Sequence, residues 1–81
     1  MHENSLKELL IFLAQSIVDD PDQVTVDLSQ GDRADILTLK VAPDDMGKVI
    51  GKKGRIATAL RTIVRAAATR EGKHIIIEIV D

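Results

Sequence analysis

Two glycines three residues apart enclose two lysines in the segment Gly51-Lys52-Lys53-Gly54. Because glycine has no Cβ, a polyanion can approach the main chain closely at both ends of such a loop. A helix that starts directly after the loop would add free N–H groups and the positive end of its dipole, both of which favour phosphate. Lys52 and Lys53 place cationic charge at the tip. The segment therefore predicts a loop that holds a sugar-phosphate backbone.

Residues on both sides of the loop extend this candidate site. Val49 and Ile50 precede it and are expected to form an apolar floor on which bases lie. Basic side chains of the following segment continue the positive field. The candidate nucleic-acid-binding residues are Lys48, Val49, Ile50, Gly51, Lys52, Lys53, Gly54, Arg55, Thr58 and Arg61.

Charge is distributed unevenly along the chain, although the net charge is only −2. Residues 1–45 contain ten acidic and three basic side chains, a net charge of −7. Residues 46–81 contain eight basic and three acidic side chains, a net charge of +5, and residues 46–70 contain seven bases and no acid. This asymmetry indicates a polyanionic partner for the second half, while the acidic half limits non-specific adsorption.

Length and composition exclude several classes of protein. A chain of 81 residues is one domain, and it contains no cysteine for a disulfide or a thiolate metal site. Phe12 is the only aromatic residue, which argues against modules that stack bases on aromatic rings. No apolar run is long enough to span a membrane, and residues 1–4 do not resemble the start of a signal peptide. A soluble cytoplasmic domain is expected.

The first element is expected to be an amphipathic helix from Ser5 to Val18. Ser5 and Glu8 have the spacing of a capping box. Pro21 ends the helix, because proline disfavours helical conformation in the residue before it. Apolar residues recur at helical spacing, which predicts one buried face. They are Leu6, Leu9, Leu10, Leu13 and Ile17.

Two strands joined by a turn are expected next. Apolar and polar residues alternate over 24–28 and over 35–41, which is typical of half-buried strands. Ser29-Gln30-Gly31-Asp32 has the composition of a turn and predicts a hairpin. Pro43 then begins a short helix, with two aspartates in its first turn.

A longer helix from Gly54 to Arg70 and a strand from His74 to Val80 complete the expected α-β-β-α-α-β order. Gly72 is placed to cap the end of the helix. The helix has an apolar face that we expect in the core. Its members are Ile56, Leu60, Ile63, Val64 and Ala67.

The stretch Val-Ile-Gly-Lys-Lys-Gly, together with this element order, resembles the GXXG signature of type II KH domains, which clamp about four nucleotides of single-stranded RNA or DNA. The resemblance covers nearly the whole chain. Length, a lone KH core and the run from Gly51 to Ala57 most resemble the KhpA family of small bacterial single-KH proteins. One departure is Ala57, since many KH domains carry a large aliphatic residue there.

The resemblance implies an α+β fold, a type II KH-like domain with a three-stranded sheet and three helices packed on one face. The whole chain, 1–81, would be a single KH domain. Within it, an N-terminal helix and first strand would occupy residues 4–30, and the KH core with its GxxG loop would occupy residues 34–80.

The resemblance also implies a non-catalytic protein that binds single-stranded RNA without cofactor, metal or membrane. Such a protein would be an RNA chaperone or a post-transcriptional regulator linked to bacterial cell elongation and division. It would form homodimers, or heterodimers with a second, larger KH-containing protein of the KhpB/Jag type.

Other interpretations of the same residues compete with this one. The glycine loop is compatible with a plain helix–helix turn, and Arg61 and Arg65 with an ordinary solvated helix face. A KH-shaped protein-interaction module would bind no nucleic acid, and a helix-hairpin-helix element would bind duplex DNA but needs no sheet. An enzyme is not indicated, because the glycine run lacks the spacing of a Walker A loop and Lys53 stands where Ser or Thr would bind magnesium.

Overall fold

The structure is a computed structural model that describes residues 3–81. Its helices and strands follow the expected order α-β-β-α-α-β, with short 3-10 turns before β1, before α2 and within the glycine loop. The elements are α1 Glu3–Gln15, β1 Thr25–Ser29, β2 Asp35–Lys40, α2 Met46–Ile50, α3 Arg55–Arg70 and β3 Ile75–Val80. Met1 and His2, which belong to the predicted domain, lie outside the described residues.

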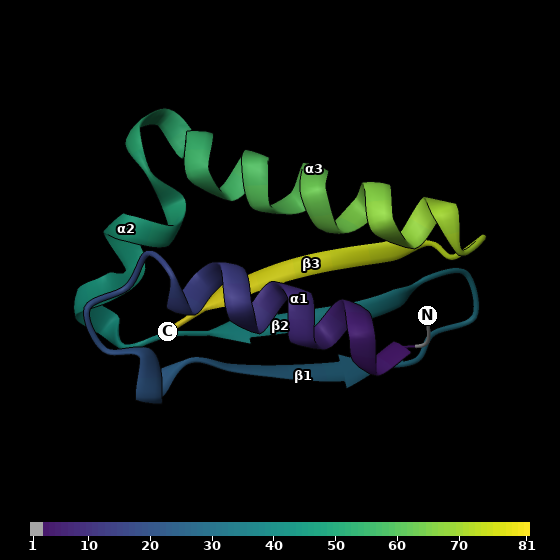
Figure 1. The fold of residues 1–81 in the computed structure, drawn as a ribbon, viewed down its shortest axis with the longest axis horizontal. Helices are drawn as coiled ribbons and strands as arrows, with labels where there is room; N and C mark the ends of the chain where they lie inside the picture. The colour runs from purple at the N-terminus through teal and green to yellow at the C-terminus, as the bar shows by residue number, and fades with distance from the viewer. Residues whose placement is uncertain (1–2) are drawn as a thin grey trace.

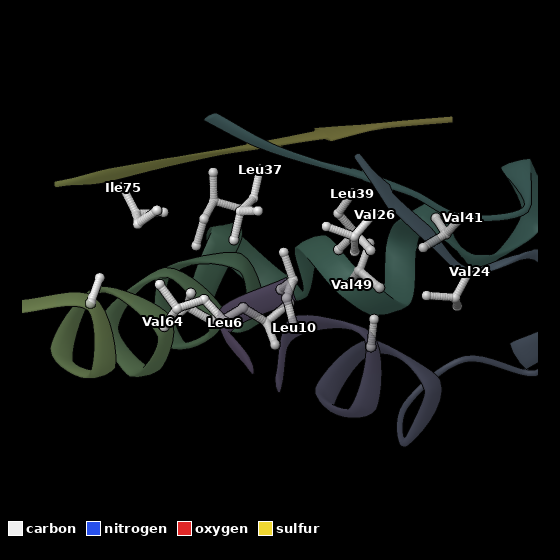
Figure 2. Close-up of a cluster of buried hydrophobic side chains, with 14 residues drawn as sticks. Leu6, Leu10, Val24, Val26, Leu37, Leu39, Val41, Val49, Val64 and Ile75 are labelled. Carbon is white, nitrogen blue, oxygen red and sulfur yellow. The ribbon is translucent and has the colours of Figure 1, made fainter. Parts of the chain in front are cut away.

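The three strands form one mixed sheet in the order β1-β2-β3. β1 pairs antiparallel with β2 through the expected hairpin, and β3 pairs parallel with β2. In this register Leu37 lies between Leu28 and Ile77, so apolar residues of all three strands share one face. The three helices cover that face (Figures 1 and 2), which confirms the predicted fold class.

The core lies between this sheet and helices α1 and α3 (Figure 2). Leu6, Leu10 and Ala14 form the buried stripe of α1. Leu9 and Leu13, also expected there, are half-buried beside it. Burying apolar surface between the two layers is the main favourable term in the stability of so small a domain.

Helix α1 starts two residues earlier and ends three residues earlier than expected. It begins at Glu3, so Ser5 lies inside the helix and the predicted capping box at Ser5 is wrong. No glycine or proline precedes Ser5 to stop the helix from extending. At the other end Ser16 Oγ donates a hydrogen bond to the Phe12 carbonyl (2.7 Å), a bond that competes with continued helix. Ile17 therefore lies after the helix and is 36% exposed.

The buried face of α3 also differs from the expected one. Ile56 and Ile63, predicted to be core residues, are 39% and 46% exposed. Leu60 and Val64 are buried as predicted, and small side chains near the two ends of the helix complete the buried stripe and let the helix approach the strands closely. This stripe consists of Ala57, Leu60, Val64 and Ala68.

The end of α3 is capped as the sequence predicts. Gly72 adopts a left-handed conformation, with φ +72°, that favours glycine. Its N–H donates to the carbonyl of Thr69 (3.0 Å), and the N–H of Lys73 donates to the carbonyl of Ala68 (2.9 Å). These two bonds form a Schellman motif, which satisfies carbonyl groups that the helix leaves unpaired.

Asp45 connects two parts of the chain that are distant in sequence. Its side chain is buried, only 2% exposed, just before α2. Its carboxylate accepts hydrogen bonds from the backbone N–H groups of Asp19 and Asp20, each at 3.1 Å. The segment that follows α1 is thereby fixed to the start of α2.

We expect Asp45→Ala to lower the free energy of unfolding by about 1.5–3 kcal/mol, the usual contribution of hydrogen bonds to a charged group. The control is Asp44→Ala, because Asp44 is exposed and its removal should change stability by less than about 0.5 kcal/mol. Urea unfolding of the two variants measures the difference. Equal stability would show that the two hydrogen bonds contribute nothing.

Candidate nucleic-acid interface

The loop between α2 and α3 is built from left-handed backbone conformations. Gly51 has φ +76°, Lys53 has φ +59° and Gly54 has φ +75°. The N–H of Gly54 donates to the carbonyl of Gly51 (3.1 Å), which closes the loop into a single tight turn. The two glycines adopt these angles without a steric cost that other residues would meet.

The two glycines are required for different reasons. A Cβ on Gly51 would lie 2.3 Å from Cγ1 and 2.9 Å from the backbone nitrogen of Ile56, so the first turn of α3 leaves no room for it. A Cβ on Gly54 would meet nothing within 4 Å. Gly51 therefore allows α3 to pack against the loop, while Gly54 leaves an open approach to the backbone from outside.

Lys52 and Lys53 project from this turn as exposed side chains. Within residues 3–81 neither lysine forms an ion pair. A non-glycine residue in the left-handed region costs about 1–2 kcal/mol, so the conformation of Lys53 must be enforced by its neighbours. The loop thus presents two ammonium groups that no described side chain of residues 3–81 neutralises.

The N-terminus of α3 faces the same opening. Gly54 is its N-cap and has no side chain, so no side-chain cap bonds to the first N–H groups of this 16-residue helix. Those donors, with the positive end of the helix dipole, favour an anion. Arg55 and Thr58 are exposed on the first turn and can donate further hydrogen bonds.

Lys48 lies before the loop and forms an ion pair with Asp19. Its Nζ donates to Oδ2 of Asp19 at 2.5 Å. This hydrogen bond is the largest cause that raises the pKa of Lys48, and the negative charges of Asp19 and Asp45 add to it. Asp19 therefore offsets part of the attraction that Lys48 would exert on a phosphate.

The expected apolar floor is only partly present. Val49 is fully buried among the core residues, so its side chain has no surface with which to contact a base. Ile50 is half-buried. The second apolar side chain at the loop is Ile56, which packs beside Gly51 and is 39% exposed. Ile56 is absent from the predicted site, because its helical spacing indicated a core position.

Arg61 lies one helical turn beyond Ala57 and joins α3 to the sheet. Its side chain is half-buried, and Nε donates to the carbonyl oxygen of Ile77 in β3 at 3.3 Å. The contact lies between α3 and the strand at the edge of the sheet. The structure therefore places Arg61 on the same helix as Arg55 and Thr58, but farther from the loop.

Comparison with known proteins places this arrangement in a family. The family described as "KhpA/KhpB, KH domain" matches residues 7–79. The chain belongs to this family. Its KH domains are non-catalytic, and the resemblance inferred from the glycine loop and the order of elements is confirmed.

Curated relatives match over their full or nearly full length. The RNA-binding protein KhpA of Clostridium acetobutylicum is 55% identical over 75 residues, which cover 93% of this chain and 100% of the relative. The RNA-binding protein KhpA of Treponema pallidum is 48% identical over 75 residues, which cover 93% of this chain and 94% of the relative.

A solved structure shares the fold at low sequence identity. The crystal structure of Era in complex with MgGDPNP and nucleotides 1506–1542 of 16S ribosomal RNA superposes with a TM-score of 0.63 and 17% identity. The match covers 91% of this chain and 28% of the Era chain. The KH fold is therefore shared with one part of a larger protein.

The requirements of a metal site and of a membrane-spanning helix are not met by the described residues. Among residues 3–81 no group of three acidic or histidine side chains is placed to hold a metal ion. None of the helices in that range has the length and apolar character needed to cross a membrane.

Three glycine-to-alanine substitutions within eight residues test the geometry of the loop. We expect Gly51→Ala to lower the free energy of unfolding most, because it adds a backbone clash to an unfavourable φ. Gly54→Ala should cost about 1–2 kcal/mol from φ alone. Gly47→Ala, which is helical and meets nothing within 4 Å, should stabilise by about 0.5–1 kcal/mol. Urea unfolding measures all three, and equal costs at Gly51 and Gly54 would contradict the close packing of Ile56.

Proposed function

We propose that this protein binds single-stranded RNA, with the loop from Gly51 to Gly54 as the clamp on the sugar-phosphate backbone. The observation that carries the proposal is a tight turn with two lysines that form no ion pair among the described residues, directly before an N-terminus of α3 that has no side-chain cap. The RNA-binding names of the KhpA relatives and the ribosomal RNA in the Era structure support RNA as the polyanion.

The proposed contacts follow from the positions of the side chains. Loop N–H groups, Lys52 and Lys53 hold the phosphates, while Arg55 and Thr58 contact the backbone next to them. Ile50 and the adjoining apolar surface lie beneath the bases, and Val49 supports the loop from the core. Lys48 and Arg61 complete the site at its two ends. With no aromatic ring to stack on bases, one domain should bind weakly and with strong dependence on salt.

The proposed cellular role is that of an RNA chaperone or post-transcriptional regulator in the cytoplasm, linked to bacterial cell elongation and division. The proposed site consists mainly of groups that would contact the RNA backbone, and such contacts carry little sequence information. A protein of this kind would act on many RNA strands rather than on one sequence. This breadth supports a chaperone or general regulator over a reader of a single motif.

A second candidate function is a KH-shaped module that binds only proteins. The exposed Ile63 on α3 favours it, because large apolar side chains at a surface often mark contacts between proteins. A helix-hairpin-helix DNA binder is not supported, since the three-stranded sheet is no part of that element. The loop lysines distinguish RNA binding from the protein-only function.

We expect replacement of both loop lysines by aspartate, Lys52→Asp with Lys53→Asp, to weaken RNA binding by about tenfold or more, the effect of losing charge-assisted hydrogen bonds. Aspartate tolerates the left-handed conformation of residue 53, so the fold should persist. Fluorescence anisotropy with labelled mixed-sequence RNA measures affinity, and amide NMR spectra report the fold.

The matched control makes the same change of charge away from the loop, at Lys7→Glu with Lys40→Glu. It should bind RNA nearly as well as the unaltered protein in the salt of the assay. A third variant, Lys52→Asn with Lys53→Asn, separates loss of positive charge from added repulsion. A protein-only module would be indifferent to all of these changes in RNA assays, since it would bind no RNA at the outset.

We also propose that the chain forms homodimers, or heterodimers with a second, larger KH-containing protein of the KhpB/Jag type. A narrow apolar seam on the exposed side of α3 supports self-association, and its small alanines would let a second helix pack closely. The seam consists of Ile56, Ala59, Ile63 and Ala66. The family name, which joins KhpA and KhpB, supports a related partner.

Sedimentation velocity over a range of concentrations tests the homodimer. We expect Ile63→Glu to abolish association, because the charge would be buried without a partner. Ile76→Glu is the matched control, since Ile76 has the same 46% exposure but lies on β3. A strict monomer at high concentration, or dissociation by the Ile76 variant alone, would contradict pairing through α3.

A further inference from the structure

A basic pocket lies at the far end of α3 from the glycine loop. It has a volume of about 290 Å³ and is open to solvent between α3 and the start of β3. Its lining consists of Arg65, Thr69, Lys73, His74, Ile75 and Ile76. Figure 1 shows the glycine loop at one end of α3, and the end of that helix beside the start of β3 at the other.

The lining has the chemistry of a phosphate site. An arginine, a lysine, an imidazole and a hydroxyl can all donate hydrogen bonds to an anion, and no acidic side chain lines the pocket. Arg65 and Thr69 are exposed, and within residues 3–81 Arg65 forms no ion pair. Ile76, which is 46% exposed, adds apolar surface that a sugar or base can contact.

The open edge of β3 connects this pocket to the loop. On the side of β3 that faces β2, the carbonyl of His74 accepts a hydrogen bond from the N–H of Asp35, and the carbonyl of Val80 accepts one from the N–H of Val41. Because the backbone groups of alternate residues point to opposite edges of a strand, the carbonyl of Ile77 is directed away from β2. This edge is where Arg61 bonds to Ile77, one helical turn before Arg65.

The spacing along α3 gives the direction of the path. Arg61, Arg65 and Thr69 follow at intervals of four residues, so they lie on one face of the helix. At 1.5 Å per residue, Arg65 is about 16 Å and Thr69 about 22 Å from Gly54 along the helix axis. This row of hydrogen-bond donors therefore runs from Arg61, on the loop side, to the pocket.

We infer that the pocket lined by Arg65, Thr69 and His74 is a second anion subsite, which takes a phosphate group of the RNA strand that the loop holds. The inference rests on the proposed function, since the loop must bind the strand first. KH loops clamp about four nucleotides, so a strand of that length would occupy the loop alone. A longer strand would reach the pocket and bind more tightly.

The test compares RNA strands of four and of about ten nucleotides, the first matching the footprint of the loop. The unaltered protein should bind the longer strand more tightly than is explained by the larger number of four-nucleotide positions that a longer strand offers to the loop. Arg65→Gln should weaken the longer strand several-fold and reduce the magnitude of its salt slope by about 0.7, the value for one phosphate contact. The four-nucleotide strand should be unaffected. Arg70→Gln, the same change on an exposed residue outside the pocket, should alter neither strand.

Amide NMR separates the possible sources of the phosphate. Signals of Thr69 and His74 should shift with the longer strand but not with the short one. If uridine monophosphate or inorganic phosphate shifts them equally at equal concentration, the pocket is a site for small anions and the inference is wrong. Equal affinity of Arg65→Gln and the unaltered protein for the longer strand would also overturn it. In both cases the variants of Lys52 and Lys53 test the proposed RNA binding by the loop separately, because they leave the pocket unchanged.

Discussion

The space left free at Gly51 is the constraint on which the site depends. Ile56 lies where a Cβ of residue 51 would be, so α3 can start directly against the end of α2. Because of this close packing, three of the four loop residues adopt positive φ angles. Lys52 and Lys53 then point outward, and Gly54 becomes the N-cap of α3 without a side chain. Cationic charge and free N–H groups are thus brought together by packing of the backbone rather than by any side-chain hydrogen bond within the loop.

The loop can keep this strained geometry because the short helix before it is anchored at both ends. Val49 is buried in the core between the sheet and the helices, and Asp45 holds the backbone N–H groups of the segment after α1. Arg61 adds a contact from α3 to β3 on the other side. The energetic cost of left-handed Lys53, about 1–2 kcal/mol, is small beside the burial that fixes these elements. Backbone donors held rigidly in place lose little entropy when a phosphate binds.

Local signals predicted the order of elements and the loop, whereas the choice between adjacent helix faces required the tertiary structure. Alternation in the strands and the glycine spacing act over a few residues, so they are readable in the chain itself. Helix α3 has apolar residues on two neighbouring stripes that share Leu60 and Val64, and only the isoleucines at 56 and 63 were wrongly expected in the core. Ala57 and Ala68 are buried because the sheet lies close to α3, and the distance between the helix and the sheet is not encoded in local sequence. The buried positions of Asp45 and Val49 likewise depend on segments far away in sequence.

A weak single site can be strengthened in two ways here, and they have different physical signatures. Under the inference above, a longer RNA strand that reaches the pocket beside Arg65 would add contacts within one protein molecule, so the gain in affinity would be independent of protein concentration. The proposed pairing through the apolar seam around Ile63 would instead raise affinity by placing two loops on one strand, and this gain would disappear when the protein is diluted below the dissociation constant of the dimer. The acidic half of the chain, residues 1–45, favours both of these routes over indiscriminate adsorption, because its negative charge opposes contact between RNA and that part of the surface. The basic half, residues 46–81, is the part of the chain that attracts a polyanion, and it contains both the loop and the pocket.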